Sequence, residues 1–173
     1  PPLYPFLVVL VFSTFGTAHF LALFITHAIL SALTCVFLYL SLVRVSHYTA
    51  GIAAGMVAAY PPFVYHSVTV PESTTLVLFL ISVFFYVLVK VYALPAPRRW
   101  ISASVTGGLL ALTEPITIPF IVLSFSYIAY LSQRSFKDGI LQLSVVLFVF
   151  AITIAPWTVR NYLVFNELVF FKS

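Results

Sequence analysis

Long apolar runs are the feature that most constrains how this chain can fold. Hydrophobic residues make up 62% of the 173 residues and charged residues only 7%, whereas a soluble domain carries roughly a quarter charged residues. The apolar runs do not alternate with polar residues as the strands of a membrane barrel would. Backbone polar groups in lipid must be paired within each segment, which leaves helices. The sequence therefore predicts an all-α fold, a polytopic transmembrane helix bundle.

The runs predict about six membrane helices and one interfacial helix in a single domain. A bilayer crossing needs about 20 residues, and the first run, 1–15, is shorter, so we expect it to lie at the interface. Proline, glycine and charged residues delimit the expected membrane helices at 17–43, 48–65, 70–92, 100–112, 116–131 and 139–155. Gly51 and Gly55 form a small-xxx-small face, which favours close contact with another helix.

The charges predict the orientation of these helices. If successive helices alternate in direction, six basic residues fall on one side and two, Arg160 and Lys172, on the other. The six are Arg44, Lys90, Arg98, Arg99, Arg134 and Lys137. The positive-inside rule makes their side cytoplasmic. Three acidic residues, Glu72, Glu114 and Glu167, then share the outer side with Arg160, and sparse charges at one face of an apolar bundle indicate a site there.

Arg160 and Glu72 are the main candidate binding residues of the outer side. Arg160 follows Pro156-Trp157, and an anion partner, either Glu114 or a lipid-linked phosphate, explains its position; a snorkelling anchor is the alternative. Glu72 opens an apolar helix, where the macrodipole stabilises a carboxylate, so it either caps the helix or holds a polar ligand. His66, six residues earlier, is a candidate ligand or base, or a plain loop histidine.

His27, Ser31 and Thr34 share one face in the middle of a predicted span. They favour hydrogen bonds between helices, with a proton or ion path as the alternative. No hydrolase, zinc-protease or nucleotide-loop signature is present, and no metal-ligating residues stand out. The single cysteine excludes an intrachain disulfide. Because the basic residues are spread singly or in pairs, we expect the lipid bilayer as a partner and no nucleic acid.

An ordered set of short motifs resembles the GT-C membrane glycosyltransferases, most closely the bacterial relatives of protein O-mannosyltransferases and aminoarabinose transferases. The motifs cover nearly the whole chain. In chain order they are Pro1-Pro-Leu-Tyr4, Phe15-Gly16, Tyr60-Pro-Pro62, Pro71-Glu72, Gly107-Gly-Leu-Leu-Ala-Leu-Thr113-Glu-Pro115 and Pro156-Trp157-x-x-Arg160-Asn161-Tyr162.

The resemblance implies transfer of a sugar from a polyprenyl-phosphate carrier to an acceptor on the outer face of the membrane. It implies a multi-pass protein of the bacterial inner (plasma) membrane, with its site facing the periplasm or exterior. The family's catalytic Asp precedes the segment that matches Pro1-Pro-Leu-Tyr4. We therefore expect residues 1–173 to be a partial transmembrane domain, without the catalytic loop and the C-terminal part, that holds no catalytic residue.

Of the candidate site residues, one matches the pattern of the resembled family and one departs from it. Glu72 matches a position at which the family often has an acidic residue opening a helix. Glu114 departs from the pattern, since relatives commonly carry Lys or Arg between that Thr and Pro, so an ion pair with Arg160 fits it better than phosphate binding. The resemblance also leaves a divalent metal cofactor open.

Two other classes of function stay open on the residues alone. A transporter segment would place ionisable groups near the midplane, where only His27 lies, so the sequence favours transport less. In a scaffold subunit without chemistry, replacing Arg160 or Glu72 would change assembly or stability and leave sugar transfer per complex intact.

Overall fold

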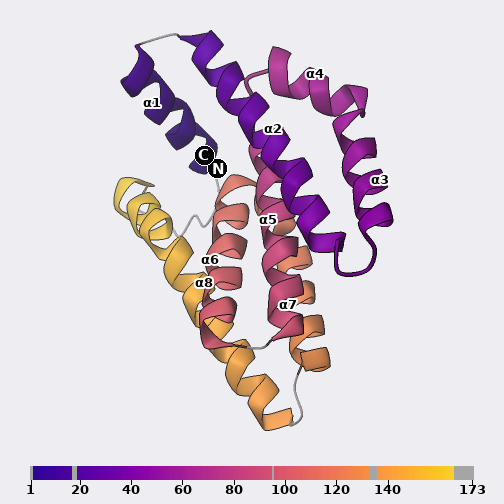
Figure 1. The fold of residues 1–173 in the computed structure, drawn as a ribbon. Helices are drawn as coiled ribbons and strands as arrows, with labels where there is room; N and C mark the ends of the chain where they lie inside the picture. Colours follow the sequence, from indigo (N-terminus) through magenta and orange to yellow (C-terminus); the bar gives the residue numbers. More distant parts are fainter. Residues whose placement is uncertain (1, 17–18, 95, 133–135, 166–173) are drawn as a thin grey trace. The chain divides into compact units, whose positions relative to one another are not determined.

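The described part of the chain is helical throughout. A computed structural model describes residues 2–16, 19–94, 96–132 and 136–165, without the side chains between 132 and 141. These residues contain no strand, which confirms the predicted all-α fold. The elements are α1 (Leu3–Phe15), α2 (Phe20–Leu42), α3 (His47–Ala58), α4 (Pro61–Thr69), α5 (Thr74–Ala93), α6 (Pro97–Thr113), the 3₁₀ turn η1 (Pro115–Thr117), α7 (Ile118–Ser132) and α8 (Phe136–Phe165) (Figure 1).

Three of the described helices are long and apolar enough to cross a membrane: α2, α5 and residues 142–165 of α8. The segments 3–15 and 115–131 are apolar but shorter. Among the described residues, these three helices meet the length of about 20 residues that a full crossing needs. The first apolar run forms α1, whose 13 residues are too few for a full crossing; its interfacial position stays a prediction.

The predicted helix 48–65 is divided in two by Pro61 and Pro62. Helix α3 ends at Ala58, and α4 begins at Pro61. Tyr60 adopts an extended conformation, with φ −73° and ψ 111°, because a residue that precedes proline is disfavoured in the helical region. Proline is well suited to the first turn of a new helix, where its missing amide hydrogen has no partner to lose.

The last helix is longer than the sequence predicts. Its expected end was residue 155, but α8 continues through Pro156 to Phe165. Proline removes one backbone hydrogen bond and can kink a helix without ending it. In a membrane, neighbouring helices, side chains and local adjustments of the backbone pair the groups that the proline leaves free, so the helix continues on both sides of it. Arg160 consequently lies on this helix, five residues beyond its expected end.

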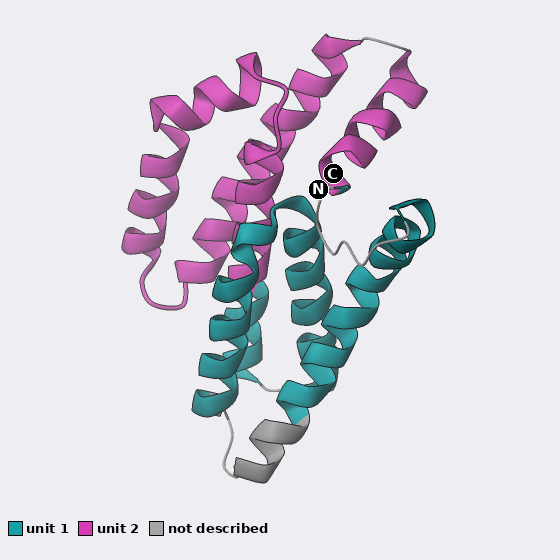
Figure 2. Cartoon of the chain, turned by 180° about the vertical axis from the view of Figure 1, so that it is seen from behind, with its two compact units in different colours: residues 1–2, 87–173 teal, residues 3–86 magenta. Residues whose placement is uncertain are grey.

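The chain forms two compact units, residues 3–86 and residues 1–2 with 87–173, with α5 contributing to both (Figure 2). In the unit 3–86, α2 packs against α1, α3 and α4. Phe37 of α2 also contacts the rings of Phe79 and Tyr86 in α5, at centroid distances of 5.9 and 5.4 Å. Gly16 ends α1 with φ +104°, a left-handed conformation that favours glycine at the end of a helix.

In the unit that contains residues 87–173, α8 packs against α6 and α7. The face of α6 that is buried consists largely of small residues: Ala103, Ser104, Gly107, Gly108 and Ala111. A Cβ atom at Gly108 would lie 2.6 Å from Cγ2 of Thr153 in α8, so the two backbones approach more closely there than a side chain allows. Helices α6 and α8 run in the same direction and diverge toward their C-terminal ends (Figure 1).

The small-xxx-small contact predicted at Gly51 and Gly55 is not formed within the described residues. A Cβ atom at either glycine would meet no atom within 4 Å. Gly108 of α6 makes the close contact instead.

Candidate functional site

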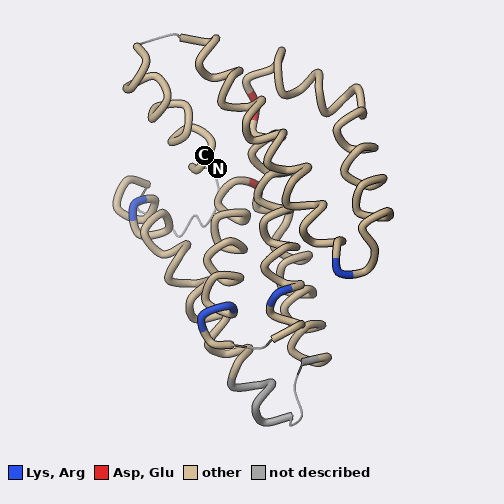
Figure 3. Tube along the Cα trace, viewed as in Figure 1, with Lys and Arg blue, Asp and Glu red and all other residues tan. Residues whose placement is uncertain are grey.

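Charged residues lie at the ends of the helices in both units (Figure 3). In the unit 3–86, the α4–α5 loop with Glu72 is at the opposite end from the α2–α3 loop with Arg44 (Figures 1 and 3). In the other unit, Arg98 and Arg99 begin α6 and Glu114 follows its last residue. Of the charges used for the orientation, Arg134, Glu167 and Lys172 lie outside the described residues, as does the side chain of Lys137.

Arg99 has a structural role at the turn between α5 and α6. Its guanidinium donates hydrogen bonds to the backbone oxygens of Lys90, at 2.9 Å, and Leu94, at 3.0 Å. Both carbonyls lie at the C-terminal end of α5, where backbone amide donors run out; the Lys90 oxygen also accepts the Leu94 amide at 3.2 Å. A basic side chain that caps carbonyls in this way stabilises the helix end.

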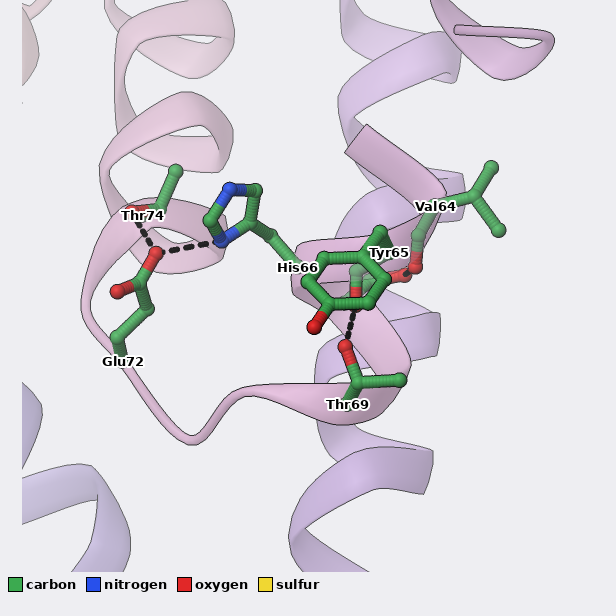
Figure 4. Close-up of polar contacts among 7 residues, drawn as sticks. Val64, Tyr65, His66, Thr69, Glu72 and Thr74 are labelled. Atoms are coloured by element: carbon green, nitrogen blue, oxygen red, sulfur yellow. Dashed lines mark hydrogen bonds and ion pairs between the residues drawn. The ribbon is translucent and has the colours of Figure 1, made fainter. Parts of the chain in front are cut away.

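Glu72 and His66 are brought together by the loop that joins α4 to α5 (Figure 4). His66 lies in the last turn of α4, and its Nδ1 atom is 2.6 Å from Oε1 of Glu72. The same Oε1 accepts a hydrogen bond of 2.7 Å from the hydroxyl of Thr74, the first residue of α5. Both ring and carboxylate stay open to the surroundings, with 37% and 40% of their side chains exposed. The two candidate residues, named separately from the sequence, thus form one polar pair that is more than one-third exposed.

A second polar group lies in the same unit, around Tyr4 and His27. The rings of Tyr4 in α1 and His27 in α2 are 5.8 Å apart. Burial, and secondarily the nearby Glu72 carboxylate, raises the pKa of Tyr4 to about 12. His27 is 0% exposed. Neither the Tyr4 hydroxyl nor either His27 ring nitrogen has a hydrogen-bond partner among the described residues, and an unpaired buried polar group costs roughly 1–3 kcal/mol.

The face formed by His27, Ser31 and Thr34 does not make the predicted hydrogen bonds between helices in the described part of the chain. The Thr34 hydroxyl donates to the Leu30 backbone oxygen of its own helix, at 2.8 Å. The Ser31 hydroxyl is buried without a partner there, as is His27. The side chains share a face as predicted, but only the Thr34 hydroxyl forms a hydrogen bond, and it does so with the backbone of its own helix.

Arg160 lies on the last two turns of α8. Its guanidinium carbon is 4.9 Å from the centroid of the Trp157 ring, a cation–π geometry. One of its nitrogens donates to Oδ1 of Asn161 at 3.3 Å, and the residue is exposed. Arginine has five N–H donors, so the remaining donors can bind an anion at this end of α8.

Glu114 and Arg160 do not form an ion pair within 4.0 Å in the described part of the chain, whereas His66 and Glu72 do. Both belong to the unit that contains residues 87–173. Glu114 follows the end of α6 and Arg160 is near the end of α8, and the two helices diverge toward these ends (Figure 1). The predicted pairing therefore lacks the approach of the two helices that it requires.

No three His, Cys, Asp or Glu side chains of the described residues lie close enough together to hold a metal ion. Sequence reasoning did not identify Tyr4 as a site residue, although it belongs to a motif of the resembled family. Its position beside His27 depends on how α1 packs against α2, which no local pattern indicates. An intramembrane histidine was the one available signal.

The long apolar helices and the charges at their ends define a polytopic membrane protein of the α-helical class. Residues 1–159 match the family model of dolichyl-phosphate-mannose-protein mannosyltransferases, and the chain belongs to this family. The family is of the GT-C type, whose members are membrane glycosyltransferases that use polyprenyl-phosphate sugar donors. No curated protein and no solved structure gives a significant match to the chain.

Proposed function

We propose that this chain takes part in the transfer of a glycosyl group from a polyprenyl-phosphate-linked donor to an acceptor on the outer face of a bacterial inner membrane. In this proposal Arg160 binds the donor phosphate, and Glu72 with His66 binds a polar part of a substrate. No residue of the described chain is assigned the role of catalytic base.

The observation that carries the proposal is the exposed guanidinium of Arg160 on a helix long enough to cross the membrane. A lipid-linked phosphate needs an apolar surface for its chain and a cation near the interface for its head. Arginine suits phosphate because its planar fork donates two parallel hydrogen bonds. Trp157 holds the guanidinium from one side, which leaves the other donors accessible. The family match ends at residue 159, so the role of Arg160 rests on this geometry.

Glu72 and His66 support the second part of the proposal by their exposure. Exposed ion pairs contribute little to stability, typically up to about 1 kcal/mol. A carboxylate and an imidazole 2.6 Å apart nevertheless offer a hydrogen-bond acceptor and a donor at one place. Such a pair can bind hydroxyl groups of a sugar or of an acceptor.

The test uses the full-length protein in membranes supplied with radiolabelled polyprenyl-phosphate sugars. We expect Arg160→Ala to lower donor-dependent transfer about 10- to 100-fold, since hydrogen bonds to charged groups contribute roughly 1.5–3 kcal/mol. Arg160→Lys keeps the charge but loses the fork, so it should retain part of the activity. The loss should fall mainly on KM for the donor.

Arg98→Ala is the matched control, because Arg98 is exposed at the start of α6 and its guanidinium forms no hydrogen bond or ion pair with the described residues. Expression and thermal unfolding of each variant are compared with the wild type. Unchanged transfer in Arg160→Ala, or an equal loss in Arg98→Ala, would contradict the role of Arg160. Absence of transfer with every donor would favour a transporter or scaffold.

A further inference from the structure

Helix α4 carries an exposed apolar surface at one end of the unit 3–86. Its buried residues are Phe63 and Ser67, which lie on one face. Tyr60, Val64 and Val68 are 59%, 47% and 46% exposed. Because residues four apart lie on the same side of a helix, these three form one continuous row, which we call the apolar stripe of α4.

The rest of the exposed surface of α4 is polar. Tyr65 is exposed next to the apolar stripe. His66 and Thr69, three residues apart, lie on the other side of the buried face, and the His66 ring points toward Glu72 (Figure 4). This division of the exposed surface is typical of a helix that lies in the plane of a membrane interface, with one side among the lipids and the other in water.

The position of α4 in the unit places the apolar stripe at the level of an interface. Helix α5 has 20 residues, which extend about 30 Å, the thickness of the hydrocarbon core. Its first residue, Thr74, therefore lies at one boundary of the hydrocarbon, and α4 ends shortly before it, at Thr69. Helix α4 runs across this end of the unit, whereas α2 and α3 run along the unit (Figures 1 and 2).

The surroundings and the chemistry of the stripe both indicate lipid as its partner. Helix α2, which packs against α4 and is long enough to cross the membrane, exposes Leu21 and Ile25 near the same end. The lipid-facing surface of the unit thus continues from α2 to α4. Tyr60 and Tyr65 each join an apolar ring to a polar hydroxyl, and tyrosine is enriched where hydrocarbon meets water.

We propose that α4 is an interfacial anchor. Its apolar stripe and Tyr65 insert between the lipid headgroups and the first part of the acyl chains, at the end of the unit that holds Glu72. His66 and Thr69 remain on the water side, so the anchor fixes the depth of the pair formed by His66 and Glu72. The inference concerns the lipid surface alone and does not depend on sugar transfer.

The test measures membrane depth by electron paramagnetic resonance, with the full-length protein in nanodiscs of phosphatidylcholine and phosphatidylglycerol. Nitroxide labels are attached to single cysteines, Val64→Cys, Val68→Cys or Thr69→Cys, in a cysteine-free background that includes Cys35→Ser. We expect the labels at positions 64 and 68 to lie about 5–10 Å below the headgroups, where dissolved oxygen reaches them better than a water-soluble nickel chelate does. The label at position 69 should show the reverse.

Ile29→Cys supplies the reference for the hydrocarbon core, because Ile29 is 56% exposed in the middle of α2. Equal access of the nickel chelate to positions 64, 68 and 69 would place α4 in water and overturn the proposal. Oxygen access at position 69 equal to that at position 29 would make α4 part of a membrane crossing, which also overturns it. Labels at 64 and 68 that neither reagent reaches would identify a protein partner in place of lipid.

The tyrosines provide a second measurement that leaves the buried face of α4 unchanged. Tyr60→Ser combined with Tyr65→Ser should shift the label at position 64 toward water, because two interfacial rings are lost. Tyr60→Phe combined with Tyr65→Phe is the matched control, since it keeps both rings, and the label should stay at its depth. Thermal unfolding of each variant shows that the protein is folded. An unchanged depth in the serine variant would overturn the anchoring role of the tyrosines.

Discussion

At the scale of single residues, buried polar side chains divide into those that bond to their own helix and those that do not. Ser104 donates to the Trp100 backbone oxygen and Thr113 to that of Leu109, both at 2.8 Å. Such bonds need no neighbouring helix, so they hold in any packing arrangement. Tyr4 and His27 cannot make them, because their polar atoms lie too far from the local backbone. Their hydrogen bonds depend on tertiary structure or on a ligand.

Tyr4 should titrate above the ordinary pKa of a tyrosine. Its pKa is raised from 10.0 to about 12, so the folded state holds this proton more tightly than the unfolded state does. The contribution to stability is complete below pH 10 and is lost as the pH rises from about 10 to 12. We expect the tyrosinate absorbance of the wild type to exceed that of Tyr4→Phe only in the upper part of an alkaline titration. A difference that appears near pH 10 would contradict the burial of Tyr4.

Glu72→Gln should separate function from stability. The pair with His66 is more than one-third exposed, so we expect a change of at most about 1 kcal/mol in the free energy of unfolding. Sugar transfer should fall at least tenfold if the carboxylate binds substrate. Thermal unfolding followed by tryptophan fluorescence measures the change in stability, and donor turnover measures the change in sugar transfer. His66→Gln is the companion variant, and loss of stability without loss of transfer would reduce Glu72 to a helix cap.

At the scale of helices, prolines and glycines decide where elements end and how closely they pack. Pro61 and Pro62 divide one predicted helix, whereas Pro156 lies within α8 without ending it. The difference lies in the residues: two successive prolines remove two amide donors, and a single one removes only one. Gly108 shows the same dependence on context, since its missing side chain matters only because α8 lies against it.

Gly108→Ala should destabilise the contact between α6 and α8. The added Cβ would lie 2.6 Å from Cγ2 and 2.7 Å from Cβ of Thr153, and overpacking costs typically about 1–3 kcal/mol. Part of this is offset by the better helix propensity of alanine, about 1 kcal/mol. We expect a lower midpoint of thermal unfolding in detergent. The double variant Gly108→Ala with Thr153→Gly should recover stability relative to the two single variants.

Gly51→Ala is the control for this experiment. It lies in α3 with no atom within 4 Å of an added Cβ, so the variant should be as stable as the wild type or slightly more stable. Loss of stability in Gly51→Ala comparable with that in Gly108→Ala would indicate a partner helix against α3 instead.

At the scale of the whole molecule, the distribution of charge should set how the chain lies in the bilayer. Basic residues at the α2–α3 loop and the start of α6 favour the cytoplasmic side. The loop that holds Glu72 lies at the other end of its unit. Because charged groups avoid the hydrocarbon, each end of α2 and α5 is expected at an interface.

Cysteine labelling measures this orientation. Cys35 is the single cysteine, so Cys35→Ser provides a background for Ser73→Cys beside Glu72 and Val45→Cys beside Arg44. We expect a membrane-impermeant thiol reagent applied from the outside to label position 73 and to label position 45 only after the membrane is opened. Labelling of both positions from the outside would contradict the orientation.

The sequence by itself determined the fold class and the positions of most helices. So few charges and such long apolar runs leave a helical membrane bundle as the one way to pair the backbone in lipid. It also named Glu72, which opens an apolar helix, and His66 as candidates, and the short α4–α5 loop brings the two side chains together. Contacts between residues far apart in the chain could not be predicted from the sequence, because periodicity indicates which face of a helix is buried but not which helix packs against it.

Tertiary structure decided the remaining features. The close contact is at Gly108, and not at Gly51, because α8 packs against α6. Glu114 and Arg160 form no ion pair, because α6 and α8, which carry them near their C-terminal ends, diverge toward those ends (Figure 1). Tyr4 and His27 meet because α1 packs against α2. In each case the sequence supplies the side chain, and the packing of helices, which depends on the shapes of both surfaces at once, selects its partner.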